Sequence, residues 1–190
     1  MSHPLIHQEF RKVILLSGIS FVSWSKKNTL HPSKSSLKER LIKFCMIKEA
    51  IILAGGLGTR LRESVPDLPK CMAPVAGRPF LFHVINYLRS QGVEKFIFSL
   101  GYKHELIEDY LSTQFSTLSY QCVIEDEPLG TGGAILLACT KAAEKNIVVT
   151  NGDTLFKIDL HKATMFHNHN NAECTLLLKP MNRFDRYGVV

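Results

Sequence analysis

The stretch AIILAGGLGTRL, residues 50–61, decides the fold. Its first four residues are apolar and two adjacent glycines soon follow, which is typical of a buried parallel strand that ends in a tight loop. Short apolar runs and amphipathic segments of helical spacing then alternate along the chain. We predict strands over 50–53, 96–100, 120–124, 147–150 and 174–178, and helices over 79–91, 103–111, 131–143 and 159–167. This alternation predicts a three-layer α/β/α domain with a mostly parallel sheet.

The first quarter of the chain differs in composition from the rest. The 190 residues carry a net charge of +6, and residues 1–45, with eight Lys/Arg and two Glu, account for all of it. A nucleic-acid partner would rest on that charge alone, so we expect none. We therefore predict a basic extension over residues 1–45 and a folded domain over residues 46–190.

Three interpretations of residues 1–45 remain open. Translation starts at Met46, or the segment is a disordered or partly helical extension, or it is an export signal. Its apolar stretch, residues 13–24, has about twelve residues, too short to span a bilayer, and no A-x-A cleavage site follows it. We expect no membrane association.

The cysteines predict the cellular compartment. Their number, five, is odd, and no C-x-x-C motif occurs. This spacing excludes a disulfide framework and the common zinc motifs, and it favours a reducing, cytoplasmic setting.

The glycine-rich loop after the first predicted strand is suited to bind phosphate. Glycines let successive N–H groups point at an anion, and the Arg60 guanidinium adds fixed donors for phosphate oxygens. The P-loop pattern and the dinucleotide fingerprint are both absent. An ordinary glycine-rich turn is the alternative. The candidate nucleotide-binding residues here are Leu53, Ala54, Gly55, Gly56, Gly58 and Thr59, with Arg60 as a candidate catalytic cation.

A lysine between two prolines follows this loop. In the segment PKCMAP, residues 69–74, the prolines stiffen the backbone around Lys70. A lysine held rigidly beside a phosphate loop can act as an electrostatic clamp, although an isolated lysine is more often solvated. Lys70 is our second candidate catalytic residue.

The pair of motifs resembles one known family. The pattern G-G-x-G-T-R-L followed by P-K-x-M is similar to that of the sugar-1-phosphate nucleotidyltransferases, over residues 48–190. The resemblance implies a Rossmann-like fold of the nucleotide-diphospho-sugar transferase type. Family members continue for several tens of residues beyond the point that matches Val190, so the resemblance also implies a domain that is incomplete at its C-terminus.

The acidic segment after the third predicted strand is the candidate base-reading site. Ionised Glu125 only accepts hydrogen bonds, and guanine presents two adjacent donors, whereas uracil would present acceptors. We therefore favour GTP, with a solvated acidic loop as the alternative. The resemblance places the base-reading residue near Glu125 and a backbone contact at Gly130, and Thr131 is a further candidate nucleotide-binding residue.

Asp153 is the candidate metal ligand. It follows the fourth predicted strand in the motif Asn151-Gly152-Asp153, and Mg²⁺ prefers carboxylate and phosphate oxygens. A turn without metal is the alternative. The resemblance implies Asp153 as both a metal ligand and a substrate-binding residue, and Tyr187 and Gly188 as further contacts to the sugar. It also implies a second metal-binding Asp, for which this sequence offers no counterpart.

The resemblance implies transfer of a nucleotidyl group from GTP to a sugar 1-phosphate, with Mg²⁺ as cofactor and pyrophosphate as product. Within the family, the motifs most resemble those of D-glycero-α-D-manno-heptose 1-phosphate guanylyltransferases, which make GDP-heptose for bacterial surface glycans. Mannose-1-phosphate guanylyltransferases and N-acetylmuramate-1-phosphate uridylyltransferases are the alternatives, and a non-catalytic nucleotide-binding remnant is the alternative of another class. The sequence does not specify an oligomeric state.

Overall fold

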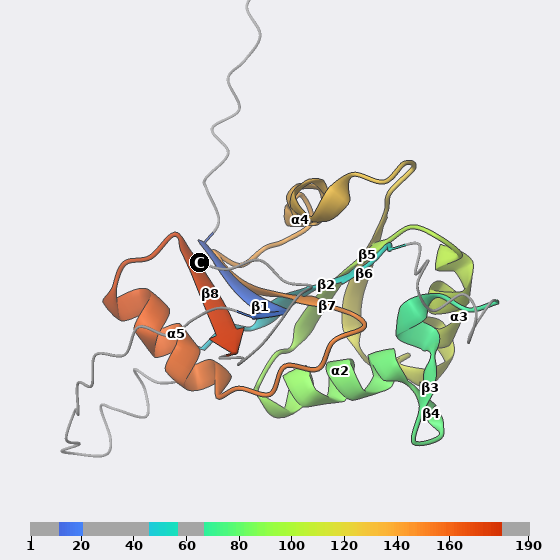
Figure 1. Cartoon of the computed structure of the whole chain (residues 1–190), viewed down its shortest axis with the longest axis horizontal. Coiled ribbons are helices and arrows are strands. Elements are labelled where there is room, and N and C mark those ends of the chain that lie inside the picture. Colours follow the sequence, from blue (N-terminus) through green and yellow to red (C-terminus); the bar gives the residue numbers. More distant parts are fainter. Residues whose placement is uncertain (1–11, 21–45, 57–66, 180–190) are drawn as a thin grey trace, which may run out of the picture.

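A six-stranded parallel sheet forms the centre of the molecule (Figure 1). The computed structural model describes residues 12–20, 46–56 and 67–179. The strand order is β6-β5-β2-β7-β1-β8, and every neighbouring pair runs parallel. The strands are β1 (Lys12–Ser20), β2 (Glu49–Ala54), β5 (Lys95–Leu100), β6 (Ser119–Ile124), β7 (Asn146–Asn151) and β8 (Cys174–Lys179).

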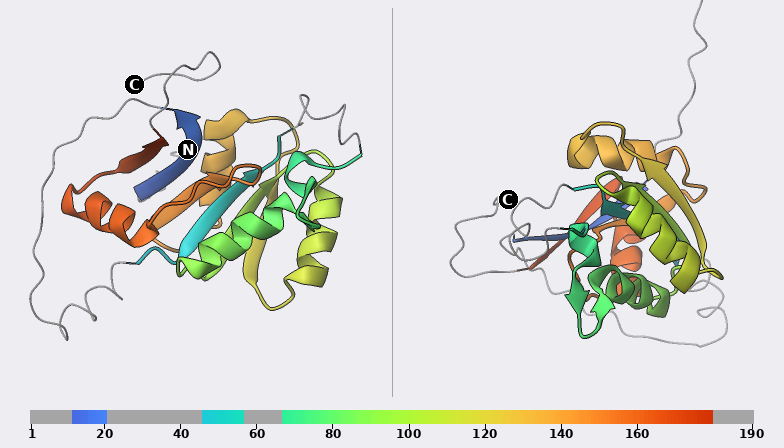
Figure 2. Two further views of the ribbon diagram at one scale, coloured as in Figure 1. Left: turned by 60° about the horizontal axis from the view of Figure 1, so that its bottom comes forward. Right: turned by 90° about the vertical axis from the view of Figure 1, so that its right-hand side faces the viewer.

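Helices lie on both faces of the sheet, which makes the three predicted layers. Figure 2 shows α4 on one face and α2 and α5 on the other. The larger core lies on the α2 side, where buried side chains of α2 and α3 pack against alternate residues of the strands. The smaller core lies between α4 and residues such as Ile51, Ile97 and Val149. The helices are α2 (Phe80–Ser90), α3 (His104–Gln114), α4 (Gly130–Cys139) and α5 (Leu160–His169).

The predicted elements are confirmed, with small shifts at their ends. Each of the five predicted strands coincides with a strand of the structure to within two residues. Helix α3 extends to Gln114, three residues beyond its predicted end at residue 111. Helix α4 ends at Cys139, four residues before its predicted end at residue 143. A short 3-10 helix, η2 (Lys70–Met72), and a hairpin of β3 (Pro74–Val75) and β4 (Arg78–Pro79) lie between β2 and α2.

Strand β1 corrects the prediction for residues 1–45. In the structure, Lys12–Ser20 is not a disordered extension but a strand inside the main sheet. It pairs with β7 on one side and β8 on the other, and its Ile14 and Leu16 side chains are buried in the larger core. The physical reason is that a run of apolar residues satisfies its backbone and buries its side chains by joining two parallel strands. The folded unit therefore includes part of the segment that composition sets apart.

Within the described residues, no helix is both long enough and apolar enough to cross a membrane. The four cysteines in this part of the chain, Cys71, Cys122, Cys139 and Cys174, form no disulfide.

Candidate nucleotide-binding and active site

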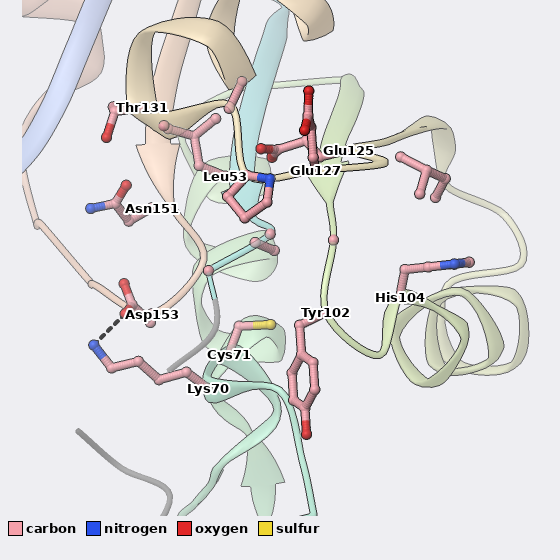
Figure 3. Close-up of a pocket in the computed structure, with 18 of the residues that line it drawn as sticks. Leu53, Lys70, Cys71, Tyr102, His104, Glu125, Glu127, Thr131, Asn151 and Asp153 are labelled. Carbon is pink, nitrogen blue, oxygen red and sulfur yellow. Dashed lines mark ion pairs between the residues drawn. The ribbon is translucent and has the colours of Figure 1, made fainter. Parts of the chain in front are cut away.

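A pocket of about 940 Å³ opens at the carboxyl ends of the strands. Its walls come from the loops after β2, β5, β6 and β7, from the start of α4 and from η2 (Figure 3). Ligands of open parallel sheets bind at this edge, because neighbouring loops diverge there and leave a crevice. The sequence predicted candidate ligand-binding residues in the loops after β2, β6 and β7, and all three loops line the pocket.

Gly55 brings the end of β2 very close to the loop after β6. A Cβ atom at this position would lie 2.6 Å from Glu125 Oε1 and 3.3 Å from the backbone nitrogen of Gly101. A side chain at this position would push the Glu125 carboxylate out of place, and glycine allows the close approach. At the adjacent Gly56, by contrast, no atom lies within 4 Å of an added Cβ.

The Glu125 carboxylate is held by donors from two different elements. Ser99 on β5 donates its hydroxyl hydrogen to Oε1 over 3.0 Å, and the backbone N–H of Leu129 donates to Oε2 over 3.2 Å. The backbone nitrogen of Glu125 in turn donates to the carbonyl of Leu100 over 2.8 Å. The side chain is half-buried and lines the pocket. Glu125 is therefore fixed in the wall rather than free in a solvated loop.

Helix α4 begins at the pocket. Gly130 is its first residue and has a φ of +68°, in the left-handed region that favours glycine. Gly130 and Thr131 both line the pocket. The N-cap residue, Leu129, forms no side-chain hydrogen bond to the start of the helix. The free N–H groups and positive dipole end of a helix start are suited to oxygen atoms of a nucleotide.

Lys70 and Asp153 form an ion pair across the pocket. Nζ of Lys70, at the start of η2, meets Oδ2 of Asp153, just beyond β7 (Figure 3). Oδ1 of Asp153 accepts a hydrogen bond from the Thr154 hydroxyl over 3.2 Å. The lysine is 40% and the aspartate 25% exposed, so both remain accessible to a ligand. The pocket thus offers a paired cation and anion that an incoming phosphate or metal can separate.

Cys71 lies beside this ion pair and remains a neutral thiol. Burial, with a smaller contribution from the negative charge of Asp153, raises its pKa to about 12. A thiol reacts as a nucleophile only after it loses its proton. Cys71 therefore contributes packing rather than reactivity.

The carboxylate of Asp153 is a ligand of the kind that Mg²⁺ prefers, and it lines the pocket. Within the described residues, no group of three or more His, Cys, Asp and Glu side chains converges on one point. A cage built only from protein ligands is thus absent from this part of the chain. Mg²⁺ commonly takes one or two carboxylates and completes its shell with water and phosphate, which is compatible with the one accessible carboxylate of Asp153.

The pocket gathers all nine of the predicted site residues that the structure describes. Lys70 and Asp153 meet in its wall as an ion pair. The other seven are the candidate nucleotide-binding residues Leu53, Ala54, Gly55, Gly56, Glu125, Gly130 and Thr131. Five further predicted residues lie outside the described residues: Gly58, Thr59, Arg60, Tyr187 and Gly188.

The loop after β5 is the part of the pocket that the sequence prediction missed. Gly101, Tyr102 and His104 line the pocket from this loop. Nδ1 of His104 lies 2.8 Å from Oε2 of Glu108 one turn further along α3. A signal was present, because β5 is also a parallel strand and its carboxyl end meets the same edge as the others.

Comparison with known proteins identifies the family. Residues 49–190 match the family described as Nucleotidyl transferase. The chain belongs to the nucleotidyl transferase family. This confirms the resemblance to the nucleotidyltransferases that the motifs G-G-x-G-T-R-L and P-K-x-M indicated.

Individual members of the nucleotidyl transferase family are also similar to the chain. A D-glycero-alpha-D-manno-heptose 1-phosphate guanylyltransferase of Aneurinibacillus thermoaerophilus is 53% identical over 142 residues, and its Campylobacter jejuni counterpart is 46% identical over the same length. In both cases the match covers 75% of this chain and 62% of the relative. The chain thus spans less than two thirds of these relatives' length.

Solved structures agree with this assignment. HddC from Yersinia pseudotuberculosis is 42% identical, with a TM-score of 0.59, and the match covers 64% of this chain and 54% of that one. HddC complexed with GMP-PN gives 41% identity and the same TM-score. The Rossmann-like, mostly parallel architecture is therefore confirmed.

Proposed function

We propose that this nucleotidyl transferase joins a sugar 1-phosphate to GTP and releases pyrophosphate. The observation that carries the proposal is the convergence of Glu125, Lys70 and Asp153 on one pocket from three separate loops. The heptose 1-phosphate guanylyltransferases, at 53% and 46% identity, support a heptose 1-phosphate as the sugar substrate. A mannose-1-phosphate guanylyltransferase of Mycobacterium tuberculosis, at 38% identity, supports mannose 1-phosphate as the alternative.

Glu125 supports guanine as the base. The carboxylate has about four lone-pair positions, of which Ser99 and Leu129 occupy two. The remaining two can accept from the ring N–H and the amino group of guanine. Uracil has no such pair of adjacent donors, so it would leave part of the carboxylate without a partner at a cost in free energy.

The reaction needs cations more than it needs a base. An oxygen of the sugar phosphate attacks the α-phosphorus of GTP, and the bond from this phosphorus to the bridging oxygen of the β-phosphate breaks, so pyrophosphate leaves with that electron pair. The attacking oxygen is already anionic, so the main barrier is the repulsion between two polyanions. The ammonium group of Lys70 reduces that repulsion. Arg60 has the same proposed role, although it lies outside the described residues.

Asp153 is the proposed ligand for Mg²⁺. When bound, the metal neutralises phosphate charge and so eases approach of the two substrates. Asp153 provides an accessible carboxylate whose Oδ1 orientation is fixed by Thr154. When no metal is bound, Lys70 neutralises the Asp153 carboxylate, so that this carboxylate is not left unpaired in the pocket.

The direct test is an assay of pyrophosphate release by this chain. The chain is incubated with Mg²⁺, with GTP or UTP, and with heptose, mannose or N-acetylmuramate 1-phosphate. Release with GTP and a heptose 1-phosphate supports the proposal, and a preference for UTP overturns the assignment of Glu125. Binding of GTP without any pyrophosphate release supports the alternative, a non-catalytic nucleotide-binding protein.

The proposed setting follows from the proposed product. A GDP-heptose would serve cell-surface polysaccharide synthesis, and GTP is a cytoplasmic substrate. The four described cysteines, which form no disulfide, are compatible with such a reducing compartment.

A further inference from the structure

Ser99 is a buried hydroxyl in the apolar interior of the sheet. Its residue is fully buried on β5, and its register neighbours are Leu53 on β2 and Val123 on β6. A hydroxyl in such surroundings costs free energy unless it forms a hydrogen bond, and an apolar side chain would avoid that cost. Packing therefore gives no reason for a serine at this position.

The single hydrogen bond of this hydroxyl goes to the pocket. Ser99 Oγ donates to Oε1 of Glu125 over 3.0 Å, while the N–H of Leu129 donates to Oε2 over 3.2 Å. On a third side, the backbone of Gly55 lies so close that a Cβ there would reach to 2.6 Å from Oε1. The carboxylate is thus held in one orientation by two donors and one steric contact.

This arrangement matters because the terminal torsion of a glutamate is soft. The carboxylate plane of Glu rotates in a broad well unless hydrogen bonds hold it. Recognition of two adjacent guanine donors requires both oxygens to lie in one plane with the base. A donor bound to each oxygen from the protein side fixes that plane before the nucleotide arrives.

We propose that Ser99 is a positioning residue for base specificity, acting by orienting the Glu125 carboxylate toward guanine. The inference rests on the proposed function, in which Glu125 accepts from the base. Ser99 does not touch the nucleotide. It sets how strongly the site prefers a base with two adjacent donors over one with a single donor.

Inosine triphosphate is the appropriate probe, because its base keeps the ring N–H of guanine and lacks the amino group. Isothermal titration calorimetry of the whole 190-residue chain in Mg²⁺ gives the dissociation constants of GTP and ITP. The chain should prefer GTP by roughly tenfold to a hundredfold, which is the effect of one hydrogen bond to a charged group. In Ser99→Ala, this preference should fall to about threefold or less, chiefly through weaker GTP binding. Ser99→Thr keeps a hydroxyl and should retain most of the preference.

Thr164→Ala is the matched control, because it removes a different fully buried hydroxyl, which donates to the Leu160 carbonyl on α5, away from the pocket. It should leave the GTP preference unchanged. Ser99→Cys, nearly isosteric and with only a weak S–H donor, serves as a second variant if Ser99→Ala fails to fold.

Two outcomes overturn the inference. An unchanged GTP preference in Ser99→Ala excludes the positioning role, provided that the unsubstituted chain prefers GTP; if GTP and ITP binding fall equally, Ser99 supports the fold alone. If the unsubstituted chain binds GTP no better than ITP and UTP, the proposed guanine recognition fails, and the role of Ser99 falls with it.

Discussion

At the scale of single residues, the Lys70–Asp153 ion pair places a cation and an anion side by side in the pocket. Neither partner can be inferred from the other in the sequence, because they lie on separate loops that only the sheet brings together. Each was nevertheless predicted on its own, from the prolines around Lys70 and from the position of Asp153 after a buried strand. Because the two side chains are paired, substituting each one alone tests its own role in the pocket.

Lys70→Ala should abolish most turnover while the fold stays intact. The substitution removes the cation and leaves the Asp153 carboxylate facing the phosphates, so charge repulsion is added to the loss of stabilisation. We expect pyrophosphate release to fall by about 10²- to 10³-fold, the size of effect seen when one such electrostatic contact is lost. Lys157→Ala, an exposed lysine in the loop after Asp153, is the control. Near-normal release by Lys70→Ala would exclude its assigned role.

Asp153→Asn should remove the effect of Mg²⁺ on nucleotide binding. With the carboxylate intact, we expect GTP to bind roughly tenfold more tightly with Mg²⁺ than with a chelator, because the metal links the carboxylate to phosphate. The amide is a much poorer ligand, so this gain should disappear. Calorimetry in both buffers measures it, with Asp159→Asn at the N-cap of α5 as control. A gain that persists in Asp153→Asn contradicts the assignment.

The buried thiol of Cys71 should make the fold sensitive to alkaline pH. Its pKa rises from 9.0 to about 12 on folding, so between these values the unfolded chain releases a proton that the folded chain retains. The contribution of Cys71 to stability is therefore complete below pH 9 and is lost as pH rises toward 12, with a limiting slope of about 1.4 kcal/mol per pH unit. Urea unfolding across pH 8–10.5 should show a smaller slope for Cys71→Ala than for Cys174→Ala, because Cys174 is an exposed residue, although burial raises the pKa of its thiol as well. Equal slopes for the two variants would contradict a raised pKa of Cys71 in the folded chain.

At the scale of elements, much of the main sheet could be predicted because β2, β5, β7 and β8 are short, mostly apolar runs. The ends of α3 and α4 were less predictable, since fraying and local turns decide where a helix stops. The contribution of the loop after β5 and of Ser99 depends on which strands are neighbours. A serine within an apolar strand carries no local sign of its partner, because Glu125 lies on the adjacent strand's loop.

The junction of β2 with the loop after β6 gives a test within one dipeptide. Gly55→Ala places a methyl group 2.6 Å from Glu125 Oε1, so the carboxylate or the backbone must move. We expect a loss of about 1–3 kcal/mol in the free energy of unfolding, as for other overpacked sites, together with weaker GTP binding. Gly56→Ala meets no atom within 4 Å and should change neither quantity. Equal behaviour of the two variants, in urea unfolding and calorimetry, would mean that this close approach is unimportant.

At the scale of the whole molecule, strand β1 shows what composition cannot predict. Its apolar run resembled a short signal-like segment, and the basic residues around it differ from the neutral remainder of the chain. Whether this segment forms an extension or a strand depends on whether β7 and β8 leave room for another strand between them. In the described part of the chain, β1 is the strand that links β8 to β7 and hence to the rest of the sheet.

The position of β1 predicts that the chain is less stable when it begins at Met46. Without residues 1–45, β8 loses its described strand partner, and the cavity left by Ile14 and Leu16 exposes the core beneath α5. Ile14→Ala tests the same contact without shortening the chain and should cost about 2–5 kcal/mol, because Ile14 is fully buried. Val13→Ala, on the opposite face and only half-buried, should cost less. Thermal unfolding of the three variants decides the matter: if all three melt with the unsubstituted chain, β1 contributes nothing to the fold, and the domain begins near Met46 as composition suggested.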